Sequence, residues 1–409
     1  MFGDSYFLII LTSLLVIVSY AYSALSKRLM VPSVLLLMGT GIGARFIFDR
    51  LGYTLPYLKT IVEFLGIVGL ILIVLEGALD LRLHRKKLWL MLRAFLSAIV
   101  ILLVSSFSIA YVMQLFHPEF SFYICLVNAI PLAVISSAIA IPSVQGIKEE
   151  KKEFIVYESI FSDILGILLF NAVLNNPTFE IGSALWLISD FVIVIVVGVV
   201  ISVLILFFIE KTTMNIKFFL LLAIMVMLYA FGKMIHLSSL LMILIFGMIF
   251  NNLDLLTPAR ISKFINVDNL RDGIDRFKMI TNESAFLIRT FFFFIFGFTL
   301  QLALFNDPIV LLSGLIVVGI LYLIRYLYLT FLARRNLFPE LFIAPRGLIT
   351  ILLYYAIPAE YSKGIISEGI LFMVILLTSL IMMIGLMSSG RKMPPTFDIY
   401  MGDKKLNSD

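Results

Sequence analysis

The chain has 409 residues, of which 61% are hydrophobic and only 14% charged, with a mean hydropathy of +1.09 and a formal net charge of +5. Soluble domains average about 25% charged residues, so the composition excludes a soluble protein and predicts an all-α polytopic membrane protein. The single cysteine, Cys125, excludes an internal disulfide, and the three histidines form no pair at metal-ligand spacing. We therefore expect no cofactor, and we expect no nucleic-acid role because membrane topology explains the net charge.

Apolar segments of about membrane length follow one another along the whole chain. Thirteen can be distinguished, at 5–25, 31–48, 61–79, 88–114, 121–144, 154–174, 184–209, 216–235, 237–250, 284–305, 308–332, 339–359 and 367–388. The ninth is short, and its boundary with the eighth is the least defined. The first segment does not resemble a signal peptide, because it starts with Asp4 instead of basic residues and runs too long.

Basic residues are distributed unevenly between the two sets of connections. One set, together with the C-terminal tail, holds 22 lysines and arginines, whereas the alternate set holds five. Because cytoplasmic loops carry the excess of basic residues, this predicts an external N-terminus and a cytoplasmic C-terminus in the inner membrane of a prokaryotic cell. The longest loop, 251–283, is then cytoplasmic, and the amphipathic stretch 261–277 predicts a surface helix within it.

Two of the predicted spans are interrupted by proline. The fifth holds Pro131 and Pro142 on either side of Ser136-Ser137, and the twelfth holds Pro345 before Arg346-Gly347. Proline removes an amide donor and clashes with the preceding turn. Interrupted spans at matching positions of two halves indicate a transport site near the middle of the membrane. Spans 1–6 and 8–13 can be paired as two inverted repeats, with the seventh as a linker.

The sixth span carries two carboxylates, Glu158 and Asp163. An acid inside the membrane is costly and is a functional candidate. At about 100° per residue, Asp163 shares a stripe with three small or polar residues: Ser159, Ser162 and Gly166. Glu158 lies on another face, so the two acids should have different partners. The alternative is a frayed, hydrated helix end, where both acids would meet nearby lysines.

Arg346 has no acid within a helical turn of itself, although it lies inside the twelfth span. A buried guanidinium needs a carboxylate from another helix, and Glu158 is the predicted partner. That pair would leave Asp163 free to bind ions. We expect Arg289 and Arg325 instead to extend toward the cytoplasmic side or the bundle wall.

Taken together, these motifs resemble the monovalent cation:proton antiporter superfamily, the sodium/proton exchangers, and in particular their thirteen-span prokaryotic members. The resemblance covers nearly the whole chain and rests on Val31-Pro32-Ser33 with Gly39 to Gly43, Leu75-Glu76-Gly77-Ala78-Leu79-Asp80, the broken fifth span, Glu158-Ser159-x-x-Ser162-Asp163, Phe291 to Gly297, and Arg346-Gly347.

The resemblance implies that two groups of helices have different roles. A homodimer-forming scaffold would comprise 1–80 and 211–306, and a moving core would comprise 81–176 and 307–390, with 177–210 as a linker helix and 391–409 as a cytoplasmic tail. Cation and proton would compete for Asp163, and Glu158 would pair with Arg346. Two features depart from the family pattern: Ser162 stands where asparagine or aspartate is usual, and the fifth span has Ser136-Ser137-Ala138 in place of Thr-Asp-Pro.

The residues predict exchange of one monovalent cation for one proton. Burial favours the protonated carboxylate, so protonation and cation binding at Asp163 exclude each other, and a single titrating acid predicts electroneutral transport. The oxygen shell would be completed by the hydroxyl groups of Ser136, Ser137, Ser159 and Ser162. Na⁺ is the first choice among cations, with K⁺ and Li⁺ as alternatives.

Three other functions compete with exchange. The departures from the family pattern favour a non-transporting membrane sensor or partner subunit. An unpaired Arg346 would suit a sodium-coupled carrier of organic anions. An intramembrane hydrolase is the weakest alternative, because Asp163 has no second acid placed with it and no Ser-His arrangement occurs.

Overall fold

The computed structural model describes residues 4–29, 31–51, 58–81, 87–144, 147–175, 193–205, 218–234, 239–252, 267–300, 307–333, 338–362 and 364–388. These residues form helices and connecting turns, and none of them forms a β-strand. The helices are α1 (Asp4–Leu29), α2 (Ser33–Leu51), α3 (Leu58–Asp80), α4 (Leu88–Phe116), α5 (Phe122–Ala133), α6 (Ser137–Ser143), α7 (Glu149–Asn175), Ile193–Ile205, α9 (Phe218–Met234), α10 (Ser239–Asn251), α12 (Val267–Thr299), α13 (Pro308–Leu327), α14 (Leu348–Tyr355), α15 (Ala359–Ser362) and α16 (Glu368–Ser388). A π-helical turn, η3 (Tyr328–Leu332), continues α13.

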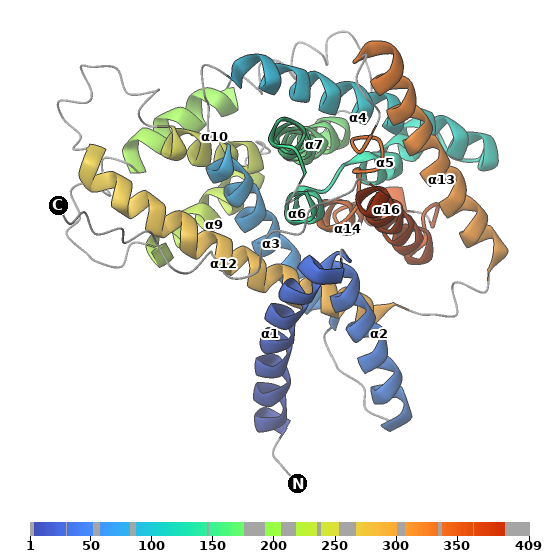
Figure 1. Cartoon of the computed structure of the whole chain (residues 1–409), viewed down its shortest axis with the longest axis horizontal. Helices are drawn as coiled ribbons and strands as arrows, with labels where there is room; N and C mark the ends of the chain where they lie inside the picture. Colours follow the sequence, from blue (N-terminus) through green and yellow to red (C-terminus); the bar gives the residue numbers. More distant parts are fainter. Residues whose placement is uncertain are drawn as a thin grey trace, which may run out of the picture.

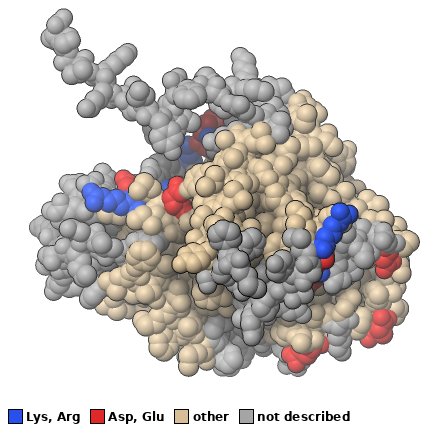
Figure 2. Space-filling view, turned by 90° about the horizontal axis from the view of Figure 1, so that it is seen from below, with Lys and Arg blue, Asp and Glu red and all other residues tan. Residues whose placement is uncertain are grey.

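Each of the thirteen predicted apolar segments contains a described helix. Six helices or helix pairs are long and apolar enough to cross a membrane by length and composition, namely α1, α4, α5 with α6, α12, α13 with η3, and α16. The surface agrees with this, since Figure 2 shows a broad face of uncharged residues with few charged side chains. The protein is therefore a multi-pass membrane protein, while the count of thirteen spans stays a prediction.

The helices pack in two groups (Figure 1). In one, α12 lies along α2 and α3, and α10 packs between α3 and α9. In the other, α4 packs on α5 and α7, α6 packs on α7, and α13 packs on α16. The main contacts between the groups join α3 to α14 and α7, and α10 to α7.

Close backbone contact joins α2 to α12. A β-carbon at Gly41 would collide with the backbone of Phe294 and Phe298, and one at Gly297 would collide with the backbone of Met38. Glycine at both positions therefore lets the two helices approach more closely than any other residue pair would allow. The glycines of the second predicted span and the phenylalanine-rich stretch of the tenth are thus two sides of one contact.

The predicted loop 251–283 differs from the structure in its second half. We expected a separate surface helix over 261–277, but residues 267–299 form one continuous helix, α12, and 253–266 lie outside the described residues. Within the charged N-terminal half of α12, Lys278 Nζ lies 2.8 Å from Asp80 Oδ1 at the end of α3. These contacts, which a local hydropathy pattern does not register, extend the helix beyond its apolar part.

Both predicted interruptions are present, although not at the prolines themselves. Pro131 lies inside α5 and Pro142 inside α6, and the helix stops between them at the extended residues 134–136. In the twelfth segment, 338–342 form turns, 343–347 have no regular secondary structure, and α14 begins at Leu348. Only the second half of that segment is therefore a regular helix.

Candidate functional site

The two interrupted segments meet at their non-helical residues. The Ser136 N–H donates to the Pro345 carbonyl at 2.8 Å, which joins the break before α6 directly to the break before α14. At the second break, Arg346 N–H donates to Thr378 Oγ1 at 3.0 Å and Gly347 N–H to Thr350 Oγ1 at 3.3 Å. The non-helical backbone, which would be costly if left without partners, is therefore held by hydrogen bonds from neighbouring elements.

Three consecutive amides of the first break find partners outside their own segment. Besides Ser136, Ile135 N–H donates to Ser162 Oγ at 2.9 Å, and Ser137 N–H donates to Asp163 Oδ2 at 3.1 Å. The carboxylate of Asp163 thus faces the N-terminus of α6. Its other oxygen, Oδ1, is buried without a hydrogen-bond partner, so this carboxylate has an unused ligand position.

The polar stripe predicted on the sixth span faces the break. Gly166 provides space for it, since a β-carbon there would collide with the side chain of Val134. Ser162 and Asp163 bond to the break directly. The other predicted hydroxyls differ: Ser159 Oγ donates to the Val156 carbonyl of its own helix, and Ser136 Oγ is buried without a partner.

The predicted Glu158–Arg346 pair is wrong as a direct contact. Glu158 is paired with Arg325 of α13, with Nη1 at 3.2 Å from Oε1 and Nη2 at 2.8 Å from Oε2. Both side chains are only 1% exposed. Ser97 of α4 donates a further hydrogen bond to Glu158 at 2.5 Å, and Arg325 Nε donates to the Glu340 carbonyl at 2.9 Å. The expectation that Glu158 and Asp163 have different partners is confirmed.

Arg346 is buried as well, with 1% exposure, but its Nε and Nη1 have no hydrogen-bond partner. Arg346 lies in the non-helical residues of the second break, where its N–H is held by Thr378 of α16. Arg325 is better placed for Glu158 because α13 packs on α4, which contributes Ser97. Our expectation that Arg325 extends to the cytoplasmic side or the bundle wall is therefore also wrong.

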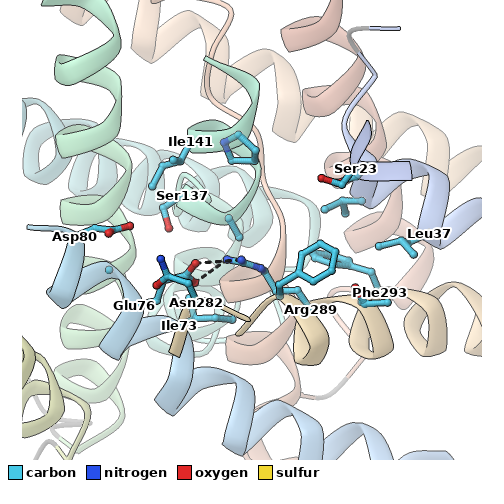
Figure 3. A pocket seen from close by; sticks show the side chains of 17 residues that line it. Ser23, Leu37, Ile73, Glu76, Asp80, Ser137, Ile141, Asn282, Arg289 and Phe293 are labelled. Atoms are coloured by element: carbon cyan, nitrogen blue, oxygen red, sulfur yellow. Dashed lines mark hydrogen bonds and ion pairs between the residues drawn. The ribbon is translucent and has the colours of Figure 1, made fainter. Parts of the chain in front are cut away.

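A cavity of about 290 Å³ lies between the two helix groups and reaches the start of α6 (Figure 3). Ser137, whose amide binds Asp163, is part of its wall. The scaffold side contributes Glu76 and Asp80 from α3 and Arg289 from α12, and Figure 3 shows Glu76 and Arg289 facing each other. Asp163 is not itself a lining residue and lies behind Ser137.

Sequence reasoning missed the ion pair in this cavity. Arg289 Nη1 lies 2.7 Å from Glu76 Oε2 and Nη2 lies 3.1 Å from Oε1. We expected Arg289 to extend toward the cytoplasmic side or the bundle wall, yet the side chains of Glu76 and Arg289 are only 16% and 20% exposed. The sequence did hold a signal for this pair. Glu76 and Arg289 are an acid and a base that each lie inside an apolar span, so they could have been considered as partners in the same way as Glu158 and Arg346.

The family assignment follows from a comparison with known protein families. The model of the family described as "Sodium/hydrogen exchanger, transmembrane" matches residues 10–389. The chain belongs to the sodium/hydrogen exchanger family. The exchanger is therefore a membrane transporter and not an enzyme, and its coarse function is cation:proton exchange. A search of curated proteins finds no match.

The fold of this exchanger is also that of solved antiporter structures. The sodium proton antiporter MjNhaP1 from Methanocaldococcus jannaschii at pH 8 is 19% identical, with a TM-score of 0.66, over 93% of this chain and 95% of that chain. An electron microscopy structure of the same antiporter gives a TM-score of 0.64 at 19% identity, over 94% and 95% of the two chains. At this identity the likeness supports the fold alone.

Proposed function

We propose that this exchanger transports one monovalent cation, Na⁺ as the first choice and K⁺ or Li⁺ as alternatives, against one proton. The observation that carries the proposal is the free oxygen of Asp163: Oδ1 is buried without a partner while Oδ2 is held by the Ser137 amide. Protonation or cation binding would satisfy Oδ1, and the two exclude each other on one carboxylate.

The ligand shell of the cation would consist of oxygens around Asp163. Hard cations prefer carboxylate, carbonyl and hydroxyl oxygens. Ser136 Oγ, which has no partner, is the best-supported second ligand, followed by the cavity-lining Ser137. Ser162 and Ser159 complete the proposed set, although their hydroxyls already bond to Ile135 and Val156.

Transport would follow from movement of one helix group against the other. The core would comprise α4 to α7 and α13 to α16, and the scaffold α1 to α3, α9, α10 and α12, consistent with the two packing groups. The cavity touches helix ends that the distribution of basic residues assigns to the cytoplasm. We further propose a lipid-embedded homodimer in a prokaryotic inner membrane, with the N-terminus outside.

Proton flux in proteoliposomes tests this proposal. A pH gradient is imposed, sodium and then potassium salts are added, and an internal pH dye is followed for the wild type and for Asp163→Asn. We expect cation-dependent collapse of the gradient in the wild type, no effect of a membrane potential on its rate, and no collapse in the variant. Full exchange by Asp163→Asn would overturn the proposal, and acceleration by a membrane potential would overturn the 1:1 stoichiometry.

A sodium-coupled organic-anion carrier is the second candidate, because two N–H groups of Arg346 have no partner. Against it, Arg346 is not among the residues that line the cavity, so an anion bound there would not meet its guanidinium. Uptake of labelled dicarboxylates driven by sodium, lost in Arg346→Gln, would favour this candidate. A well-folded protein with neither activity would favour the non-transporting sensor.

A further inference from the structure

The cavity holds two carboxylates, and a basic residue of α12 binds each of them. Arg289 occupies both oxygens of Glu76, and Lys278 Nζ lies 2.8 Å from Asp80 Oδ1. A bidentate guanidinium is among the strongest partners a carboxylate can have. In the described part of the chain, the carboxylate next to this cavity that keeps a buried oxygen without a hydrogen-bond partner is Asp163.

The cavity nevertheless has the polar groups that a bound cation requires. Asn282 Oδ1 and Thr290 Oγ1 are buried without partners on the α12 side of the wall. Figure 3 shows Asn282 beside Glu76 and Arg289. Glu76 is also close to the exchange site, since a β-carbon on the adjacent Gly77 would lie 3.7 Å from Ile160, one helical turn before Asp163.

We propose that Arg289 is a specificity-determining residue: it acts as a tethered cation that neutralises Glu76 and prevents the cavity from holding a second transported ion. The inference rests on the proposed exchange function and deepens it. With Arg289 in place, the negative charge of Glu76 is neutralised, so one cation at Asp163 makes the whole site neutral. Without it, Glu76, Asn282 and Thr290 would offer oxygen ligands and a negative charge next to Asp163.

The experiment measures Na⁺ binding as the rise of the thermal unfolding midpoint of purified protein with NaCl, at ionic strength held constant with choline chloride. In Arg289→Gln we expect the half-saturating Na⁺ concentration to fall by about tenfold, because a freed carboxylate in a partly buried site attracts the cation. Arg289→Lys keeps the charge and should stay near the wild-type value. Size-exclusion profiles check that each variant is folded.

The double variant Glu76→Gln/Arg289→Gln removes the pair together and keeps the test decisive if Arg289→Gln alone does not fold. We expect wild-type half-saturation from it, because Glu76 contributes no ligand while Arg289 is bound. Several-fold weaker binding by the double variant, or an unchanged value in folded Arg289→Gln, would overturn the inference.

The same measurement separates this inference from the proposed function. If wild-type protein shows neither cation-dependent flux nor a cation-dependent unfolding midpoint, the exchange function fails and the inference fails with it. If wild-type protein responds to Na⁺ and Arg289→Gln does not shift the response, only the role of Arg289 is wrong.

Discussion

At the scale of single residues, the core depends on which arginine neutralises Glu158. Arg325 makes both hydrogen bonds, and the pair is almost fully buried. Removing one member of a buried pair leaves an uncompensated charge, whereas removing both often costs little. The contact geometry therefore makes Arg325, and not Arg346, the main structural partner of Glu158.

We accordingly expect Arg325→Met to destabilise the protein by about 3 to 5 kcal/mol. Arg346→Met should cost much less, because the Nε and Nη1 groups of Arg346 have no hydrogen bonds to lose. The double variant Glu158→Gln/Arg325→Met should recover most of the loss. Thermal unfolding in detergent measures all three, and a larger loss in Arg346→Met than in Arg325→Met would contradict the pairing.

At the scale of elements, the interruption between α5 and α6 is maintained by side chains of α7. Ser162 accepts the Ile135 amide and Asp163 accepts the Ser137 amide, while Pro345 of the other interrupted segment accepts the Ser136 amide. The prolines of the fifth segment lie inside the two short helices instead. The break is therefore a tertiary feature that the neighbouring helices hold in place.

Ser162→Ala tests this account, because it leaves the buried Ile135 amide without a partner. We expect a loss of stability of about 1 to 3 kcal/mol. Ser159→Ala is the matched control on the same helix: its hydroxyl bonds to the Val156 carbonyl of α7, so its removal leaves no buried amide without a partner and should cost less stability than Ser162→Ala. Equal unfolding midpoints for the two variants would show that Ser162 does not hold the break.

At the scale of the whole molecule, the proposed mechanism requires the two helix groups to move against each other. Few contacts join the groups, and one of them is between α3 and α7. There, a β-carbon at Gly77 would lie 3.7 Å from Ile160 Cγ2. Ile160 Cγ2 marks a position that the sulfur of a cysteine at residue 160 can take, so a disulfide from residue 77 can link α3 to α7 at this contact.

We expect oxidation of Gly77→Cys/Ile160→Cys, in a Cys125→Ala background, to stop cation:proton exchange and reduction to restore it. The control pair Gly314→Cys/Met373→Cys lies between α13 and α16, inside one packing group. Its oxidation should leave exchange intact. Proteoliposome flux before and after reductant measures both, and full exchange by the oxidised α3–α7 pair would argue against movement between the groups.

The sequence by itself was enough for every feature that depends on local pattern. Hydropathy over about 20 residues marked the thirteen apolar segments, each of which contains a helix. The proline-containing segments indicated the two interruptions, and the helical period placed Ser162 and Asp163 on the face that meets the first break. The motifs also identified the exchanger family, to which residues 10–389 belong.

Only the tertiary structure decided which charges meet. Glu158 and Arg325 are 167 residues apart in the sequence, and Glu76 and Arg289 are 213 apart. Such pairs depend on which helices pack together and how they are rotated, and a local pattern contains neither quantity. The continuous α12 has the same cause, since the contact of Lys278 with Asp80 gives its charged N-terminal half a partner on α3.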